Sequence, residues 1–180
     1  MNDVLLISED RVKTITNLND NLYNEYLLPA ITNSQVIDLQ GILGSCLYSK
    51  ILSLVSDGTI TADTNTQYKY LLDNNIRYFL AWQVAAEIIP ICTINIDNAG
   101  AVRNTDEHRE HLSTEQFDII VSHYQHIADS YRRMLQDFLK ENAELYPELE
   151  QCSCSGIKPN LESSNSSRIW LGGYRGRIMP

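Results

Sequence analysis

Two long stretches of the chain place apolar side chains at three- and four-residue steps, which is the spacing of one face of an α-helix. The first spans about residues 65–90 and is apolar on nearly every face from Leu80 onward, as in a helix at the centre of a domain. The second follows Ser113 for about 30 residues, to near Tyr146 and Pro147. Helices this long constrain the fold, because each must bury its apolar face against other elements.

Shorter helices are predicted before and between the long ones. A first is expected over residues 8–17, and a second over about 30–42 with Pro29 at its first position, where a proline removes no intrahelical hydrogen bond. Gly44 is expected to break this pattern, which then resumes and continues to Ser56. These segments would supply the other helices of a bundle.

Capping and turn residues set the expected ends of the elements. Thr64–Gln67 and Ser113–Gln116 both have the spacing of a capping box, in which two side chains satisfy free amides at a helix start. Pro90 is expected to end or kink the first long helix, and a hairpin should pair residues 93–96 with 101–104. The predicted fold class is mainly α: a helical bundle of about four helices with one small β-hairpin and an extended C-terminal arm.

Charge and composition change near residue 150. Residues 1–150 hold 10 basic and 22 acidic side chains, a net charge of −12, whereas residues 151–180 carry a net charge of +3. Residues 151–167 are rich in Ser, Gly, Asn and Pro, a composition typical of a flexible linker. We therefore divide the chain into a helical body, 1–150, and a linker with a docking arm, 151–180.

The tip of the arm combines aromatic, aliphatic and basic side chains. So short a segment has no core of its own to bury its Trp and Tyr, and both residue types are favoured at protein interfaces. We predict that the arm docks on another subunit or protein. The residues expected to bind this partner are Arg168, Ile169, Trp170, Leu171, Tyr174, Arg175 and Arg177.

All four histidines lie close together in the sequence, as His108, His111, His123 and His126. Clustered histidines suggest a metal site, and the last two can share one helix face. However, no zinc-enzyme spacing such as H-E-x-x-H accompanies them, and no third ligand on a fixed element can be identified. Solvated or interface histidines are the favoured interpretation, and no metal or other cofactor is predicted.

The cysteines and glycines carry no catalytic signature. Cys152 and Cys154 form a C-x-C pair without a second pair, whereas Cys46 and Cys92 lie in apolar sequence and are typical of small core residues. There is no G-x-S-x-G motif and no glycine loop for phosphate. We expect that the protein is not an enzyme and has no catalytic residues.

Composition also limits the cellular compartments and the classes of partner that can be expected for this chain. A net charge of −9 argues against a sequence-independent nucleic-acid binder, which needs a basic face. Val4–Ile7 is followed at once by acidic residues, unlike a targeting signal. The longest apolar stretch, Phe79–Ile96, contains Gln, Glu, Pro and Asn, which a membrane span tolerates poorly. We expect a soluble protein, made in a reducing cytoplasm, with no membrane partner.

Several stretches of hydrophobic and turn residues match a known family. They are Leu27–Ile31, Gln40–Tyr48, the helix Tyr70–Pro90, Asn98–Val102 with Asp106–His108, and Ile169–Gly173. Together they cover roughly residues 27–147 and the tip of the arm. They resemble the head-to-tail connector proteins of tailed phages, in particular the ring (adaptor) proteins of crAss-like phages. The Cys-Ser-Cys linker departs from the pattern of that group.

This resemblance implies a structural virion protein that performs no chemistry. It would assemble in the bacterial host cytoplasm as a homo-oligomeric ring, usually a dodecamer, beneath the portal protein at the phage neck. There it would extend the DNA channel and carry the next neck or tail ring protein. An acidic channel wall repels phosphates, so genomic DNA passes without specific binding. A basic arm that reaches an acidic neighbouring body would supply the two unlike patches that a cyclic ring needs.

Three other interpretations stay open. One is a soluble helical protein-interaction domain of another purpose. A second is a DNA-packaging, terminase-like subunit, which requires a basic helix-turn-helix face, whereas only Arg132 and Arg133 are adjacent in the body. A third is a metal-dependent helical enzyme that uses the histidine cluster.

Overall fold

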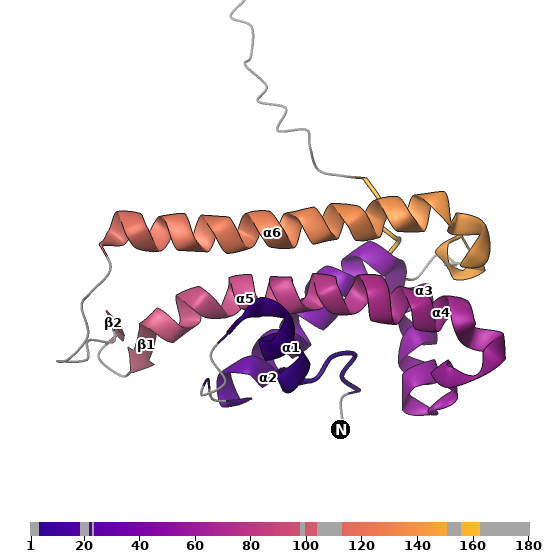
Figure 1. Cartoon of the computed structure of the whole chain (residues 1–180), viewed down its shortest axis with the longest axis horizontal. Helices are drawn as coiled ribbons and strands as arrows, with labels where there is room; N and C mark the ends of the chain where they lie inside the picture. Colours follow the sequence, from indigo (N-terminus) through magenta and orange to yellow (C-terminus); the bar gives the residue numbers. More distant parts are fainter. Residues whose placement is uncertain are drawn as a thin grey trace, which may run out of the picture.

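The computed structural model describes residues 4–18, 22, 24–97, 100–103, 113–150 and 156–162. The predicted mainly helical fold is confirmed. Helices α5 (Arg77–Thr93) and α6 (Thr114–Glu141) lie antiparallel along the longest axis (Figure 1). Helices α1 (Glu9–Thr16) and α2 (Asn24–Asn33) pack on α5, so α5 is the central helix of the bundle.

A composite helix joins α2, a π-helical turn η1 (Ser34–Leu39) and α3 (Gln40–Ser56) without an intervening loop. The prediction that Pro29 begins a helix is wrong, because it lies inside α2. Leu27 and Ile31, on either side of it, are fully buried. Their burial favours a helical backbone through the proline, although one hydrogen bond is lost there.

A second composite helix joins α4 (Thr66–Leu71), the π-helical turn η4 (Leu72–Ile76) and α5. Pro90 was expected to end or kink this helix, and the first of these two outcomes is wrong, because α5 continues to Thr93. Ile88, two residues before the proline, is buried, so packing favours the helical backbone up to this point. Tertiary burial therefore overrides a local helix-breaking residue at two places in the chain.

The two expected capping boxes have different outcomes. The box at Ser113 is confirmed: its hydroxyl accepts from the Gln116 amide at 3.2 Å, and the Gln116 side chain accepts from the Ser113 amide at 3.0 Å. The box at Thr64–Gln67 is wrong. A short 3-10 helix, η3 (Asp63–Asn65), precedes α4, and the Thr66 hydroxyl donates to the Asp63 carbonyl at 2.8 Å instead.

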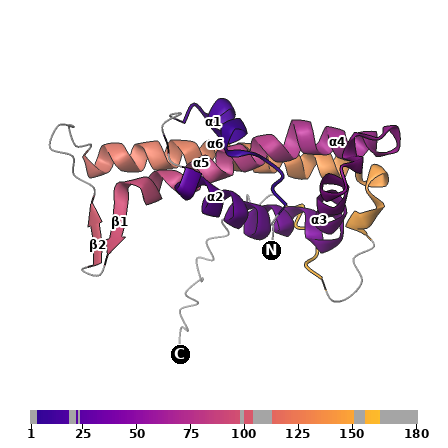
Figure 2. The same ribbon diagram turned by 90° about the horizontal axis from the view of Figure 1, so that it is seen from below.

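Short elements complete the chain. Strands β1 (Ile94–Asp97) and β2 (Gly100–Arg103) pair antiparallel, with Ile94 opposite Arg103, and project at the end of the molecule away from α3 (Figure 2). Both strands are shifted from the expected hairpin, in which residues 93–96 pair with residues 101–104. The shift arises because Thr93 is the last residue of α5. Helix α6 ends at Glu141, earlier than expected, and three more 3-10 helices follow the long helices: η2 (Thr59–Thr61), η5 (Ala143–Leu145) and η6 (Pro147–Leu149).

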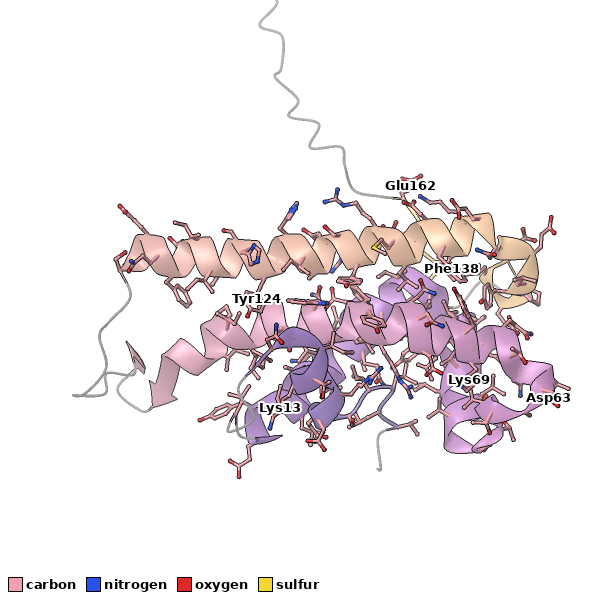
Figure 3. The ribbon with its side chains drawn as sticks, in the orientation of Figure 1. Lys13, Asp63, Lys69, Tyr124, Phe138 and Glu162 are labelled. Atoms are coloured by element: carbon pink, nitrogen blue, oxygen red, sulfur yellow. The ribbon has the colours of Figure 1, made fainter. Side chains whose placement is uncertain are left out.

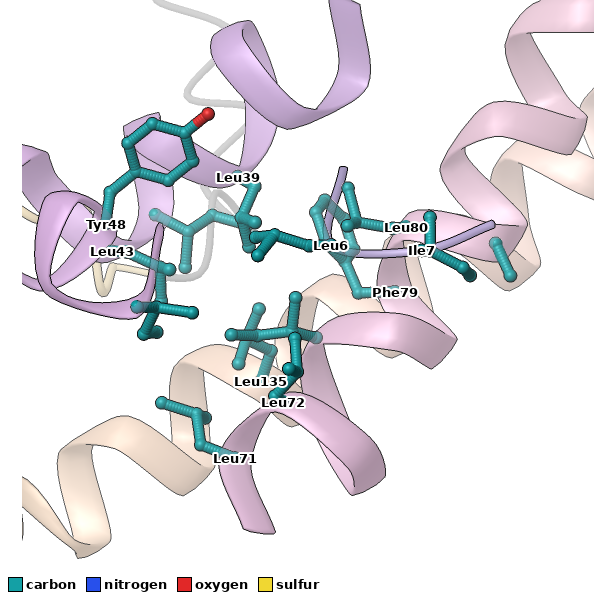
Figure 4. Close-up of a cluster of buried hydrophobic side chains, with 14 of the residues drawn as sticks. Leu6, Ile7, Leu39, Leu43, Tyr48, Leu71, Leu72, Phe79, Leu80 and Leu135 are labelled. Carbon is teal, nitrogen blue, oxygen red and sulfur yellow. The ribbon is translucent and has the colours of Figure 1, made fainter. Parts of the chain in front are cut away.

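The N-terminal segment 4–7 forms part of the hydrophobic core (Figure 4). Leu6 and Ile7 are almost fully buried there. The buried Gln35 of η1 holds the segment: its Oε1 accepts from the Leu6 amide at 2.9 Å, and its Nε2 donates to the Val4 carbonyl at 2.9 Å.

One helical run, Glu25–Ser56, is long and apolar enough to cross a membrane by length and composition. Core helices of soluble proteins pass the same test, and 44% of its most apolar window is buried inside the protein. The run also contains the buried Gln35 and a non-helical residue, Gly44. These features are those of a core helix, because a membrane span has no water to satisfy a broken backbone.

Candidate docking site

The predicted partner-binding residues, Arg168, Ile169, Trp170, Leu171, Tyr174, Arg175 and Arg177, lie outside the described residues. His108, His111, Cys152 and Cys154 lie outside them as well. What the structure describes is the place on the body from which the arm departs. That place is built around Gly44.

Gly44 interrupts α3 as predicted. Its backbone angles, φ 73° and ψ 161°, fall in a region that essentially only glycine occupies. In a regular helix the Ser45 amide would donate to the Gly41 carbonyl. The kink separates these two groups and leaves both without their helical partner, inside a largely buried segment.

The C-terminal residues 156–162, which we call the strap, supply both missing partners. The Ser45 amide donates to the Ile157 carbonyl at 2.9 Å, and the Asn160 amide donates to the Gly41 carbonyl at 3.0 Å. The Ile157 amide in turn donates to the Ser45 hydroxyl at 2.9 Å. The strap therefore completes the backbone hydrogen bonding of α3 across the kink.

The strap also fits the space that the missing Gly44 side chain leaves open. A Cβ at this position would lie 2.7 Å from Cδ of Pro159 and 2.9 Å from its nitrogen. On its other side the strap meets α6, where the buried Gln136 Nε2 donates to the Asn160 carbonyl at 2.8 Å and to the Glu162 carbonyl at 3.3 Å (Figure 3). These seven residues belong to the segment predicted as a linker, and hydrogen bonds join them to both α3 and α6.

A groove lies between the junction of α2 and η1, the helix α5 and the helix α6. It has a volume of about 420 Å³. Its charged lining consists of three carboxylates, Asp38, Glu87 and Asp129, and one guanidinium, Arg132. We call it the acidic groove. No local pattern in the sequence indicates this groove, because its lining comes from residues 33–38, 83–87 and 125–132, which are distant in the sequence.

Hydrogen bonds hold two of the three carboxylates in place. Asp38 accepts from Arg132 at 2.9 Å and from Gln83 Nε2 at 3.1 Å. Glu87 accepts from the buried Ser34 hydroxyl at 3.0 Å and from Asn33 Nδ2 at 3.3 Å. The groove walls are therefore fixed, with their negative charge already oriented.

Asp129 is the least constrained acid of the acidic groove. Its side chain is 59% exposed, and its ion pair with Arg132 Nε measures 4.0 Å. That buried Nε has no hydrogen-bond acceptor among the described residues. Asp129 is therefore free to meet a cation from outside the body, and the exposed Ile37 at the rim offers an apolar contact beside it.

The histidines form no metal site in the part of the chain that the structure describes. His123 and His126 are exposed on α6, where the His123 ring contacts Tyr124 edge-on at 6.1 Å between ring centroids. Within the described ranges, no group of three His, Cys, Asp or Glu side chains is placed to hold a metal ion. The side chains of the other two histidines are not among those described.

Aromatic residues fix α6 against α5. Tyr131 stacks on Tyr78 at 6.0 Å and on Trp82 at 6.3 Å between ring centroids, and Trp82 also meets Tyr124 at 5.8 Å. The rings are half-buried, in agreement with the core-edge spacing of tyrosines in the sequence. The α6 wall of the acidic groove is therefore held rigidly against α5.

A second aromatic contact closes the body below the strap. The Tyr68 hydroxyl donates to Glu148 at 2.8 Å, and the Tyr146 hydroxyl donates to the Gln67 carbonyl at 3.1 Å. Burial, and then the hydrogen bond and charge of Glu148, raise the pKa of Tyr68 well above its usual range. Burial, with a smaller contribution from Tyr70, raises the pKa of Tyr146 to about 12.

The profile of a family of unknown function, DUF6712, matches residues 39–158, two thirds of the chain. The matched region runs from the end of η1, through the Gly44 kink, into the strap. No curated protein and no solved structure matches the chain.

Proposed function

The chain belongs to the family of unknown function DUF6712, and from that starting point we propose that it is a structural subunit of a ring at the neck of a tailed phage. The ring joins the portal to the next neck or tail ring protein and extends the DNA channel. It resides in the virion and is assembled in the host cytoplasm. The proposed role requires no catalysis, no cofactor and no membrane.

One observation carries this proposal: a basic, aromatic arm leaves an acidic helical body next to a fixed anchor. The strap ties the chain to α3 and α6 up to Glu162. Beyond it, residues 163–180 contain three arginines and no acidic residue. An anchored arm of opposite charge suits assembly, because it links one subunit to the next while the body keeps its shape.

The residues that resemble phage connectors support the proposal in a second way. Gln40–Tyr48 contains the kink that receives the strap, and Tyr70–Pro90 covers the end of α4, all of η4 and most of α5. The resemblance therefore falls on the segments that build the centre of the body and anchor the arm. The same proposal includes two contacts of the assembled ring. The hairpin contacts the DNA channel or a neighbouring subunit, and the arm contacts the partner.

Light scattering of the purified protein, alone and mixed with the portal protein of the same phage, tests this function. We expect a closed ring, twelvefold by the resemblance, either directly or on addition of portal. The informative variant ends after Glu162, because it removes the arm and retains the strap. It should remain folded and fail to join the portal.

A chain that stays monomeric with every neck component would refute the ring function. The favoured interpretation would then be a helical interaction domain of another purpose. Salt-dependent DNA binding by the purified protein would instead favour the terminase-like alternative, since phosphate contacts make binding fall steeply with salt.

A further inference from the structure

We propose that the acidic groove is the docking site for the basic C-terminal arm, residues 168–178, of a neighbouring copy of this chain. The inference rests on the proposed ring, which brings copies side by side, and it specifies the surface that joins them. The occupant is the arm itself, with its arginines facing the groove acids and its aromatic side chains on the apolar rim.

Charge complementarity is the first argument. The charged side chains of the groove are three carboxylates and one guanidinium, and the arm brings three arginines. Asp38 is already paired with Arg132, whereas Glu87 is oriented by hydrogen bonds from the neutral Ser34 and Asn33, so Glu87 needs no reorganisation to accept a cation. Arg side chains suit such a site, because the planar guanidinium donates to carboxylates in a fixed fork.

Apolar complementarity is the second argument. Ile37 at the rim is 69% exposed, so its side chain is available to an apolar partner that sits over the groove. The arm contains Ile169, Trp170 and Leu171 next to its first arginine. The arm therefore carries a cation that can pair with the groove acids and, next to it in the sequence, apolar side chains that can cover Ile37.

The length of chain after the strap gives the third argument. Gln136, which binds the Glu162 carbonyl, lies four residues from Arg132, or about 6 Å along α6. The groove wall from Gln125 to Arg132 adds about 10 Å. The six residues from Glu162 to Arg168 can span at most about 20 Å, which is enough to carry Arg168 past the far end of the groove of its own subunit and toward a neighbouring copy.

Photocrosslinking of the full-length protein tests this docking. Leu171→p-benzoylphenylalanine places the reactive group in the arm and leaves every arginine and Trp170 in place. Copies labelled with ¹⁴N and ¹⁵N are mixed before assembly with portal, irradiated, digested and analysed by mass spectrometry. We expect crosslinked peptides of mixed isotope that join the arm to η1 or to the Gln125–Arg132 segment of α6.

Charge reversal on α6 supplies a matched pair of variants. Asp129 lines the groove, whereas Asp137 lies outside its lining; their side chains are 59% and 61% exposed, and each pairs with a base three residues later. Asp129→Lys should lower the yield of groove crosslinks about tenfold, because one attraction becomes a repulsion. Asp137→Lys should leave the yield unchanged, and circular dichroism checks that both variants are folded.

The outcomes separate this inference from the proposed function. Rings with crosslinks outside the groove, or with groove crosslinks of a single isotope only, would overturn the docking and leave the ring intact. Mixed-isotope groove crosslinks in a sample that never forms a ring with portal would retain the docking and refute the neck function. Equal yields in the Asp129→Lys and Asp137→Lys variants would overturn the electrostatic basis of the docking.

Discussion

Replacing Gly44 by alanine tests whether the strap holds the body together. The glycine sits at φ 73° and ψ 161°, a backbone conformation that costs other residues about 1–3 kcal/mol. The new Cβ would also lie 2.7 Å from Cδ of Pro159, a separation at which the strap must move. The two amide–carbonyl bonds between α3 and the strap would then be lost, at about 1 kcal/mol each. We expect the free energy of unfolding to fall by about 3–5 kcal/mol.

Urea unfolding followed by circular dichroism measures this loss, and amide hydrogen exchange locates it. Exchange of the Asn160 amide should accelerate in the variant, since its acceptor is the Gly41 carbonyl. This change is expected whether the strap is pushed away or α3 straightens and takes Gly41 back as its own partner.

Two other glycines provide controls for the separate contributions. A Cβ on Gly41 meets nothing within 4 Å at a helical position, so Gly41→Ala should be neutral or slightly stabilising. A Cβ on Gly58 also meets nothing, but its φ is 69°, so Gly58→Ala should show backbone strain alone, about 1–2 kcal/mol. A Gly44→Ala loss no larger than that of Gly58→Ala, with unchanged exchange at Asn160, would refute the strap argument.

Three further predictions concern the strap and the body beneath it. A chain that ends after residue 162 should keep the stability of the full protein. A chain that ends after residue 150 should lose about 2–4 kcal/mol of unfolding free energy, measured in urea, because the backbone groups at the Gly44 kink lose their partners. Equal stabilities of the two truncated chains would contradict this prediction. Gln136→Leu should destabilise by about 1–3 kcal/mol and speed cleavage after Glu162 by a glutamate-specific protease, since it leaves two strap carbonyls without a donor. The pKa of Tyr146 is about 12 in the folded protein and near 10 in the unfolded chain. The contribution of this phenol to the free energy of unfolding is therefore complete below pH 10, and it falls by about 1.4 kcal/mol per pH unit between pH 10 and 12. Tyr146→Phe should flatten that alkaline slope, and an unchanged slope would show that this phenol does not titrate on unfolding.

Local sequence patterns correctly predicted the features that depend only on residues close to one another in the sequence. The helical spacing of apolar residues indicated both long helices, and the capping box at Ser113 forms as expected. Gly44 was identified as a break because its conformational freedom is a property of the residue itself. The division of charge between body and arm is likewise a property of composition and needs no structure.

Local rules failed where burial competes with them. Pro29 and Pro90 are helix breakers in isolation, yet both lie inside helices whose neighbouring apolar side chains are buried. The capping box at Thr64 is a different case: no residue of η3 is buried, and the Thr66 hydroxyl donates to the Asp63 carbonyl there instead. At the two prolines the tertiary environment was stronger than a preference of about one hydrogen bond.

The sequence by itself determined a mainly helical, acidic body with a basic, aromatic C-terminal end. Only the tertiary structure decided that polar residues with the composition of a linker act as a strap, and that Asp38, Glu87 and Asp129 share one groove. The Ile157 amide and the Ser45 hydroxyl it binds are 112 positions apart, and no local periodicity records such a pairing. The physical reason is that the backbone groups left open at Gly44 can be satisfied by any segment that reaches them, and only the folded chain shows which segment does.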